Sequence, residues 1–245
     1  MEKTQTAAGI KKLKGVRKIS MLTAYDSLFA KILDETGIDI ILVGDSLGNV
    51  ALGYKNTVPV TLMEMVIHTQ AVARVVQNSM IVADLPFGTF QQGVEHALCS
   101  AVDLIKAGAN AVKLEGAEYT EAVKAIVKAG IPVVGHLGFK PQSVNQTGFK
   151  CKVQSEKLKA KAKKLEQAGC FAVVLEMVDE KIAAQITKAL KIPTIGIGSG
   201  SHCDGQVLVT ADLLGLYENP PKFVKKRSNL RNIIKSALIE FKESI

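Results

Sequence analysis

The chain has 245 residues, of which 47% are hydrophobic, and it carries a formal net charge of +8. This length suits one substantial core and lies close to the ~250 residues typical of a single eight-fold β/α barrel. No apolar run approaches the ~18 residues of a membrane helix, and the start of the chain lacks the hydrophobic core of a signal peptide. We therefore expect one cytoplasmic domain over 1–245, with a basic helical tail from about residue 222 and no membrane partner.

The positive charge is concentrated in two lysine-rich segments, 150–164 and 222–235, which contain few aromatic residues. Nucleic-acid surfaces usually combine basic side chains with aromatic ones that stack on bases. We therefore interpret these segments as solvated helix faces, or as a surface that attracts acidic small molecules, and expect no nucleic-acid partner. The four cysteines lack C-x-x-C spacing, which predicts free thiols at Cys99, Cys151, Cys170 and Cys203.

Short β-branched runs alternate with helical patterns along the whole chain, which indicates βαβ units and a parallel sheet. Eight strands are predicted at 18–24, 38–44, 80–83, 111–115, 131–135, 171–175, 193–197 and 206–210. Helices are predicted at 27–35, 61–77, 91–107, 118–129, 155–168, 179–190 and 229–242. Loops are expected at 47–60 and 137–153, and the second is long enough to act as a lid or an oligomer contact.

The first strand-to-helix turn argues for a closed (β/α)8 barrel rather than an open nucleotide-binding sheet. Residues 23–26 read Thr-Ala-Tyr-Asp, where a dinucleotide-binding fold would have a glycine-rich turn. A nicotinamide cofactor is therefore not expected.

Polar residues gather at the predicted strand ends, where the active sites of β/α barrels lie. They are Asp45, Ser46, Asp84, Lys113, Glu115, His136 and Glu176. Because side chains alternate along a strand, Lys113 and Glu115 should point into one pocket. Four converging carboxylates need a cation, and Mg²⁺ suits them because it prefers oxygen ligands and leaves room for an oxygen-rich substrate. Zinc fits less well, because only His136 among the four histidines is well placed.

Eight short motifs in this order resemble the ketopantoate hydroxymethyltransferase family, over about 19–224. They are MLTAYD at 21–26, VGDSLG at 43–48, ADLPF at 83–87, VKLEG at 112–116, GHLG at 135–138, PQS at 141–143, IGIG at 195–198 and DGQ at 204–206. The resemblance implies a magnesium-dependent (β/α)8 TIM barrel of the phosphoenolpyruvate/pyruvate type. It also implies a transferase of pantothenate biosynthesis, on the coenzyme A pathway, and a homodecamer.

The implied reaction adds a hydroxymethyl group from 5,10-methylenetetrahydrofolate to 3-methyl-2-oxobutanoate, giving 2-dehydropantoate. Carried onto this sequence, the resemblance implies that Asp45 and Asp84 bind Mg²⁺, with Glu115 completing its shell directly or through water. Ser46 and Lys113 would hold the keto acid together with the two aspartates, and Glu176 would be the catalytic base. A metal-chelated 2-oxo acid has an acidified C3 proton, which a positioned carboxylate can remove.

Other interpretations stay open from the sequence. The same carboxylates would serve another magnesium-dependent enolate lyase or mutase of this barrel type, without folate. The glycines of 196–200 would suit a phosphate-binding barrel. Glu176 would otherwise be a structural carboxylate at a loop, and Lys113 with Glu115 a structural ion pair. His68 and His96 lie in helical patterns, and the adjacent His202 and Cys203 lack further ligands, so we expect no metal at these residues.

Overall fold

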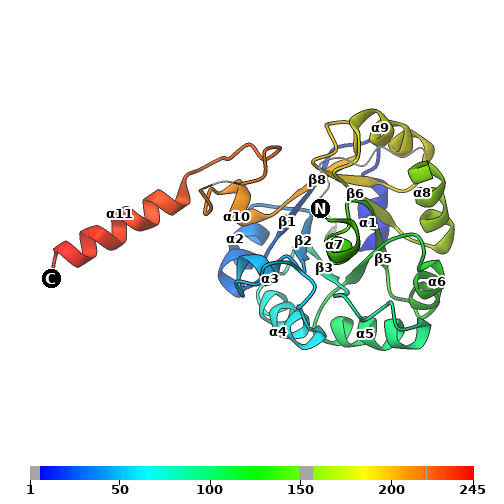
Figure 1. The fold of residues 1–245 in the computed structure, drawn as a ribbon, viewed down its shortest axis with the longest axis horizontal. Helices are drawn as coiled ribbons and strands as arrows, with labels where there is room; N and C mark the ends of the chain where they lie inside the picture. Colours follow the sequence, from blue (N-terminus) through cyan, green and yellow to red (C-terminus); the bar gives the residue numbers. More distant parts are fainter. Residues whose placement is uncertain (1–5, 149–156, 219) are drawn as a thin grey trace. The chain divides into compact units, whose positions relative to one another are not determined.

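The computed structural model of the chain describes residues 6–148, 157–218 and 220–245. Their contacts divide the chain into two compact units, Met1–Val207 and Leu208–Ile245. The strands form a closed barrel in the order β1 to β8, and every paired neighbour is parallel (Figure 1). A helix follows every strand except β7, which leads directly to β8, and the closed parallel barrel confirms the predicted architecture.

All eight predicted strands are present, with ends that shift by a few residues. They are β1 (Ile19–Thr23), β2 (Ile40–Val43), β3 (Met80–Asp84), β4 (Ala111–Glu115), β5 (Val133–Gly138), β6 (Ala172–Glu176), β7 (Thr194–Ile197) and β8 (Gly205–Leu208). The prediction for β5 was wrong at both ends. Pro132 has no N–H to donate to a ladder, and pairing with β6 continues as far as Gly138, so His136 lies inside the strand.

The helices between the strands also match the prediction closely. They are α2 (Ser27–Glu35), α4 (Leu62–Ala73), α5 (Val94–Lys106), α6 (Thr120–Lys128), α8 (Lys157–Ala168) and α9 (Glu180–Ala189). Thr61 begins α4 with a capping box, in which its hydroxyl accepts from the Glu64 N–H and Glu64 Oε2 accepts from the Thr61 N–H.

The segments predicted as loops contain short helices. Segment 47–60 includes α3 (Leu47–Val50), and segment 137–153 includes the 3₁₀ turn η1 (Pro141–Ser143) and α7 (Val144–Thr147). Such single turns are too short to produce an apolar period, which is why the sequence pattern did not reveal them. Residues 149–153 of the second loop and the predicted start of α8 at 155–156 lie outside the described residues.

Alternating side chains build two separate cores. Inside the barrel, Leu42, Met80, Val82, Val134 and Val174 pack together, whereas the other face of each strand packs against the helices. On β4, Val112 and Leu114 belong to the outer core and Ala111 to the inner one. Lys113 and Glu115 therefore face the barrel interior, as the strand period predicts.

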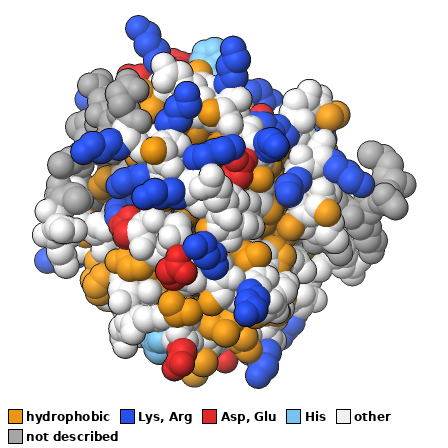
Figure 2. All heavy atoms as spheres, turned by 90° about the vertical axis from the view of Figure 1, so that its right-hand side faces the viewer, with side chains coloured by type: hydrophobic (Ala, Val, Ile, Leu, Met, Phe, Trp, Pro, Cys, Tyr) orange, Lys and Arg blue, Asp and Glu red, His pale blue; other side chains and the backbone are white. Residues whose placement is uncertain are grey.

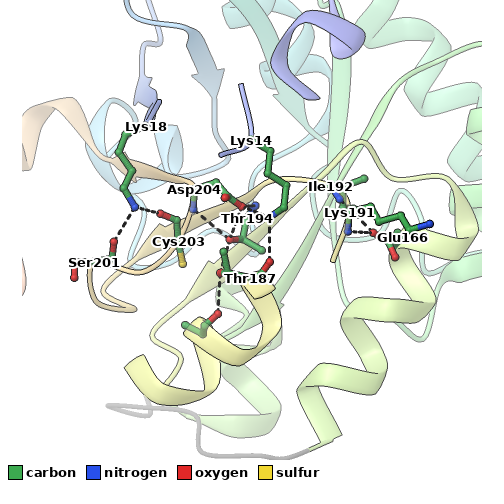
Figure 3. Close-up of polar contacts among 11 residues, drawn as sticks. Lys14, Lys18, Glu166, Thr187, Lys191, Ile192, Thr194, Ser201, Cys203 and Asp204 are labelled. Carbon is green, nitrogen blue, oxygen red and sulfur yellow. Dashed lines mark hydrogen bonds and ion pairs between the residues drawn. The ribbon is translucent and has the colours of Figure 1, made fainter. Parts of the chain in front are cut away.

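A short N-terminal helix, α1 (Ala7–Lys12), was not predicted. Its Ile10 is fully buried and packs with the inner core residues Ile19 and Met21. Two residues after this helix, Lys14 Nζ donates to Asp204 Oδ2 at 2.6 Å and to the Thr187 carbonyl at 3.0 Å (Figure 3). One buried residue in six gives no helical period, so the sequence alone did not show that this segment packs against the barrel core.

The second unit contains α10 (Thr210–Leu213), which was not predicted, and the predicted C-terminal helix α11 (Leu230–Glu243). Within this unit Arg227 N–H donates to the Leu213 carbonyl, and Arg231 pairs with Glu218 at 2.8 Å. None of the residues of α11 is buried, although several are large and apolar: Ile233, Ile234, Leu238, Ile239 and Phe241.

The described lysines of segment 150–164 lie on the solvated face of α8, as predicted. On the face of the molecule seen in Figure 2, basic side chains are spread singly and in small groups among uncharged and hydrophobic ones. In α8 the buried positions are Leu158, Ala162, Leu165 and Ala168, and the lysines occupy the remaining face.

No helix among the described residues is long and apolar enough to cross a membrane. Cys99, Cys170 and Cys203 are free thiols, and Cys151 lies outside the described residues.

Candidate active site

The predicted strand-end residues meet at the carboxyl-terminal mouth of the barrel because the strand register aligns them. Asp84 on β3 is the register partner of Lys113 on β4, and Glu115 is the partner of His136 on β5. Gly138 is in turn the partner of Glu176 on β6. Neighbouring strands thus deliver their polar side chains to the same end of the barrel.

Asp45, Asp84 and Lys113 form a buried charged cluster. Lys113 Nζ lies 2.6 Å from Asp84 Oδ1, and the Asp45 N–H donates to Asp84 Oδ2 at 3.1 Å. Burial and then the charge of Asp84 raise the pKa of Asp45 to about 8. Burial alone would lower the pKa of Lys113, but Asp84, Asp45 and Glu115 together raise it above its ordinary value. The cluster therefore holds a firmly charged ammonium among more carboxylates than it can neutralise.

On the other side of the mouth, His136 lies between two glutamates. Its Nδ1 is 3.5 Å from Glu115 Oε1 and its Nε2 is 3.2 Å from Glu176 Oε2. Neither ring nitrogen has a well-aligned hydrogen-bond acceptor among the described residues, so the attraction is mainly between charges. Burial alone would lower the pKa of His136, but Glu115 and then Glu176 raise it to about 9. Near pH 7 an imidazolium therefore faces both carboxylates.

The backbone around Glu176 is unusually constrained. Met177, the next residue, has φ 51°, the one positive φ recorded for a residue other than glycine in the described chain. The Glu176 carbonyl accepts from the Phe139 N–H at 2.8 Å. Gly138 has φ 106°, and a Cβ placed there would overlap that carbonyl. Met177 is therefore the strained position, and the Phe139 hydrogen bond holds the Glu176 backbone at the rim, where the Glu176 side chain is 20% exposed.

Two residues of the mouth were missed as site residues by sequence reasoning, although both lie in the motifs quoted above. Tyr25 OH lies 2.8 Å from Ser46 Oγ, and the Tyr25 carbonyl lies 2.6 Å from His68 Nδ1. Gln142 in η1 is buried and donates from Nε2 to Asp45 Oδ2 at 2.8 Å, while its N–H donates to Glu115 Oε2 at 3.3 Å. A neutral amide in a loop has no charge or period to mark it, so only the PQS motif pointed to Gln142.

Asp45 and Asp84 fit a hard divalent cation. The Asp45 backbone binds the Asp84 carboxylate, and the pKa of Asp45 is raised by burial and then by the charge of Asp84, which a further cation would neutralise. Gln142 bridges Asp45 and Glu115, so Glu115 suits contact through water rather than direct ligation. No set of three His, Cys, Asp or Glu side chains within the described ranges converges as a complete ligand cluster. This donor set therefore suits an ion that shares its shell with substrate and water, as Mg²⁺ does.

The other sequence candidates do not join the site. His202 is exposed and 3.8 Å from Glu180, and His96 Nδ1 lies 2.9 Å from the Thr89 carbonyl. In the loop after β7, the Ser199 hydroxyl is buried, donating to the Leu175 carbonyl and accepting from the Val178 N–H, and Gly200 lies against the Glu180 carboxylate. A carboxylate in that position disfavours a phosphate.

Comparison with known proteins agrees with this geometry. The family model for ketopantoate hydroxymethyltransferase matches residues 4–245. The chain is 52% identical over 245 residues to 3-methyl-2-oxobutanoate hydroxymethyltransferase of Thermotoga maritima (strain ATCC 43589 / DSM 3109 / JCM 10099 / NBRC 100826 / MSB8), covering 96% of this chain and 90% of that one. It is 48% identical to the enzyme of the same name from Caldicellulosiruptor bescii (strain ATCC BAA-1888 / DSM 6725 / KCTC 15123 / Z-1320), covering 100% and 96%.

Solved structures share the fold at much lower identity. Phosphoenolpyruvate phosphomutase from Streptomyces platensis subsp. rosaceus superposes with a TM-score of 0.68 at 14% identity, over 97% of this chain and 86% of that one. A phosphonopyruvate hydrolase, crystallised with oxalate and Mg²⁺, has a TM-score of 0.65 at 14% identity, over 85% and 81%. These likenesses show that the chain shares the barrel fold of these proteins. The match of the family model and the identity to its curated relatives place the chain in the ketopantoate hydroxymethyltransferase family.

Proposed function

We propose that this chain transfers a hydroxymethyl group from 5,10-methylenetetrahydrofolate to 3-methyl-2-oxobutanoate, giving 2-dehydropantoate for pantothenate and coenzyme A biosynthesis. The observation that carries the proposal is the division of the carboxylates at the barrel mouth. Asp45 and Asp84 adjoin Lys113, whereas Glu176 stands apart on β6 and is held by His136. The side with Asp45, Asp84 and Lys113 suits a metal cation and the substrate anion. The side with Glu176 offers a separate base.

Asp45 and Asp84 would hold Mg²⁺, with Glu115 contributing through water. When bound, Mg²⁺ supplies a Lewis acid that polarises the keto group and so acidifies C3 of the substrate. Crystals of the structurally similar phosphonopyruvate hydrolase contain oxalate with Mg²⁺, a comparable pairing of a small carboxylate anion with this ion. Lys113 provides the positive charge for the substrate carboxylate, and Ser46, positioned by Tyr25, provides a hydroxyl.

Glu176 then removes the C3 proton, and the C–H electron pair moves into the enolate. His136, charged near neutral pH, keeps the Glu176 carboxylate oriented before the transfer. Water adds to the methylene carbon of the donor and its two C–N bonds break, so that tetrahydrofolate leaves with both protons of the water and a formaldehyde unit remains. The enolate carbon bonds to that carbon, and the resulting alkoxide takes a proton to become the hydroxyl group. Glu176 must lose its proton before the next cycle.

The protein is proposed to act in the cytoplasm as a homo-oligomer. The exposed apolar residues of α11 support self-association, and the decamer rests on the family resemblance. Small-molecule keto acid and folate are the proposed partners, with no nucleic acid and no membrane. Sedimentation velocity that gives a monomer at micromolar concentration would contradict the oligomer.

Proton NMR of 3-methyl-2-oxobutanoate in heavy water tests the function directly. The wild-type protein with Mg²⁺ should exchange the C3 hydrogen for deuterium without folate, and chelation of Mg²⁺ should stop the exchange. Added 5,10-methylenetetrahydrofolate should then yield 2-dehydropantoate. Exchange without any transfer would favour a different enolate lyase or mutase of this barrel type, and absence of both would refute the proposal.

A further inference from the structure

A pocket of about 220 Å³ opens at the barrel mouth on the side of Glu115 and Gln142. Since the same Gln142 side chain donates to Asp45, the pocket lies one side chain away from the proposed keto-acid site. Its remaining wall includes three aromatic residues and three amides: Phe87, Phe90, Tyr119, Gln91, Asn145 and Gln146. Neither Asp84 nor Lys113 lines it, so it is distinct from the place assigned to the keto acid.

Two rings of the aromatic wall pack against each other, and the third is carried on a hydrogen-bonded turn. Phe90 and Tyr119 meet edge to face with ring centroids 5.0 Å apart. Phe87 stands at the start of a tight turn in which the Thr89 hydroxyl donates to the Pro86 carbonyl at 2.7 Å and the Gly88 N–H donates to Gln91 Oε1 at 2.8 Å. The Phe87 side chain is nevertheless 46% exposed. An exposed ring carried on a hydrogen-bonded turn beside a polar site is a ready stacking surface.

The polar part of the wall is mainly neutral. Asn145 and Gln146 on α7 are exposed, and no hydrogen bond joins their side chains to another residue of the described chain. The lysine that lines the pocket, Lys140, is already paired with Glu118. Free amides beside stacking rings match the donor and acceptor edge of a flat, uncharged nitrogen heterocycle better than they match an anion.

We infer that this pocket binds the bicyclic pterin ring of the one-carbon donor, an inference that rests on the proposed function. The pocket is too small for a whole folate, so the rest of the donor would extend over the rim. A pterin ring in this pocket would lie close to the keto acid. The reaction requires this, because the donated carbon must reach C3 of a keto acid held on the other side of Gln142.

Three substitutions test this subsite. Phe87→Leu removes the stacking ring but keeps an apolar side chain, Phe87→Tyr keeps the ring, and Phe223→Leu changes a phenylalanine of similar exposure, 39%, outside the pocket. Anaerobic calorimetry would measure the Kd of tetrahydrofolate in the presence of Mg²⁺ and 3-methyl-2-oxobutanoate. Deuterium exchange at C3 without folate would be measured on the same samples.

Phe87→Leu should raise the Kd of tetrahydrofolate about 5- to 100-fold, the range for loss of one stacked ring, and slow C3 exchange far less. Phe87→Tyr and Phe223→Leu should bind tetrahydrofolate like the wild type. If Phe87→Leu slowed exchange as much as it weakened tetrahydrofolate binding, or bound tetrahydrofolate normally, the subsite would be refuted and the proposed function would stand. A wild-type protein that neither exchanges C3 nor binds tetrahydrofolate would refute both.

Discussion

At the scale of single residues, the site depends on which carboxylate each cation faces. Lys113 faces Asp84, and His136 faces Glu115 and Glu176, so the two buried cations serve different halves of the mouth. Removing one partner of a buried pair is more harmful than removing both, because a charge is left without a counterion. The consequences of substitutions at Lys113 and at His136 should therefore be separable.

Lys113→Met should weaken binding of 3-methyl-2-oxobutanoate at least about tenfold while leaving Mg²⁺ binding intact or stronger. The reason is that an ammonium attracts the substrate carboxylate but competes with a metal for Asp84. Titration calorimetry with each ligand measures both effects, and Asp84→Asn, which should lose Mg²⁺ binding, is the contrasting variant. Equal losses of both affinities in Lys113→Met would mean that the lysine is only structural.

The pKa of His136 gives a prediction for stability. The folded state raises this pKa to about 9 from the ~6.5 of an unfolded chain, so the proton is bound more tightly in the fold. The stabilisation is therefore complete below about pH 6.5 and is lost as the pH rises through about 9, at up to about 1.4 kcal/mol per pH unit. Urea unfolding of wild type and His136→Asn should show a difference in free energy that shrinks over this range. A difference that stays constant would contradict the assigned charge.

At the scale of elements, the charged residues that follow the strands were predictable from the sequence, and the functional residues of the loops were not. Asp45, Asp84, Glu115 and Glu176 could be found because each ends an apolar run, and the barrel topology then brings them together. Gln142 and Phe87 lie in turns, where no period or charge marks them, and their roles depend on contacts between segments far apart in the chain. The shift of β5 had the same origin, because pairing with β6 decides where that strand ends.

The contact between β5 and the end of β6 gives a prediction of its own. Gly138 and Gly130 both have positive φ, but only at Gly138 would a Cβ collide with backbone, at the Glu176 carbonyl. Gly130→Ala should therefore cost only the conformational strain, about 1–2 kcal/mol, whereas Gly138→Ala should cost more and also slow C3 exchange. Chemical denaturation and exchange on both variants provide the comparison. Equal behaviour of the two would show that Gly138 does not position Glu176.

At the scale of the whole molecule, the charge of +8 is distributed over helix faces, and this suits diffuse attraction of anions rather than a specific complex. Raising the salt concentration from about 50 to 500 mM should therefore raise KM for a polyglutamylated folate more than for the monoglutamate, because screening weakens only the long-range term. Steady-state kinetics with the two donors in parallel measure the difference. Identical salt dependence would assign the basic surface no part in donor capture.

The account as a whole requires that Glu176 is the base that forms the enolate, and one measurement decides this. Glu176→Gln keeps the size of the side chain, so it should bind Mg²⁺ and 3-methyl-2-oxobutanoate like the wild type. In heavy water without folate it should exchange the C3 hydrogen at least about 100-fold more slowly, the lower limit for loss of a general base. Glu121→Gln, on the exposed face of α6, should exchange at the wild-type rate. Exchange by Glu176→Gln at the wild-type rate would contradict the assignment and place the base elsewhere at the barrel mouth.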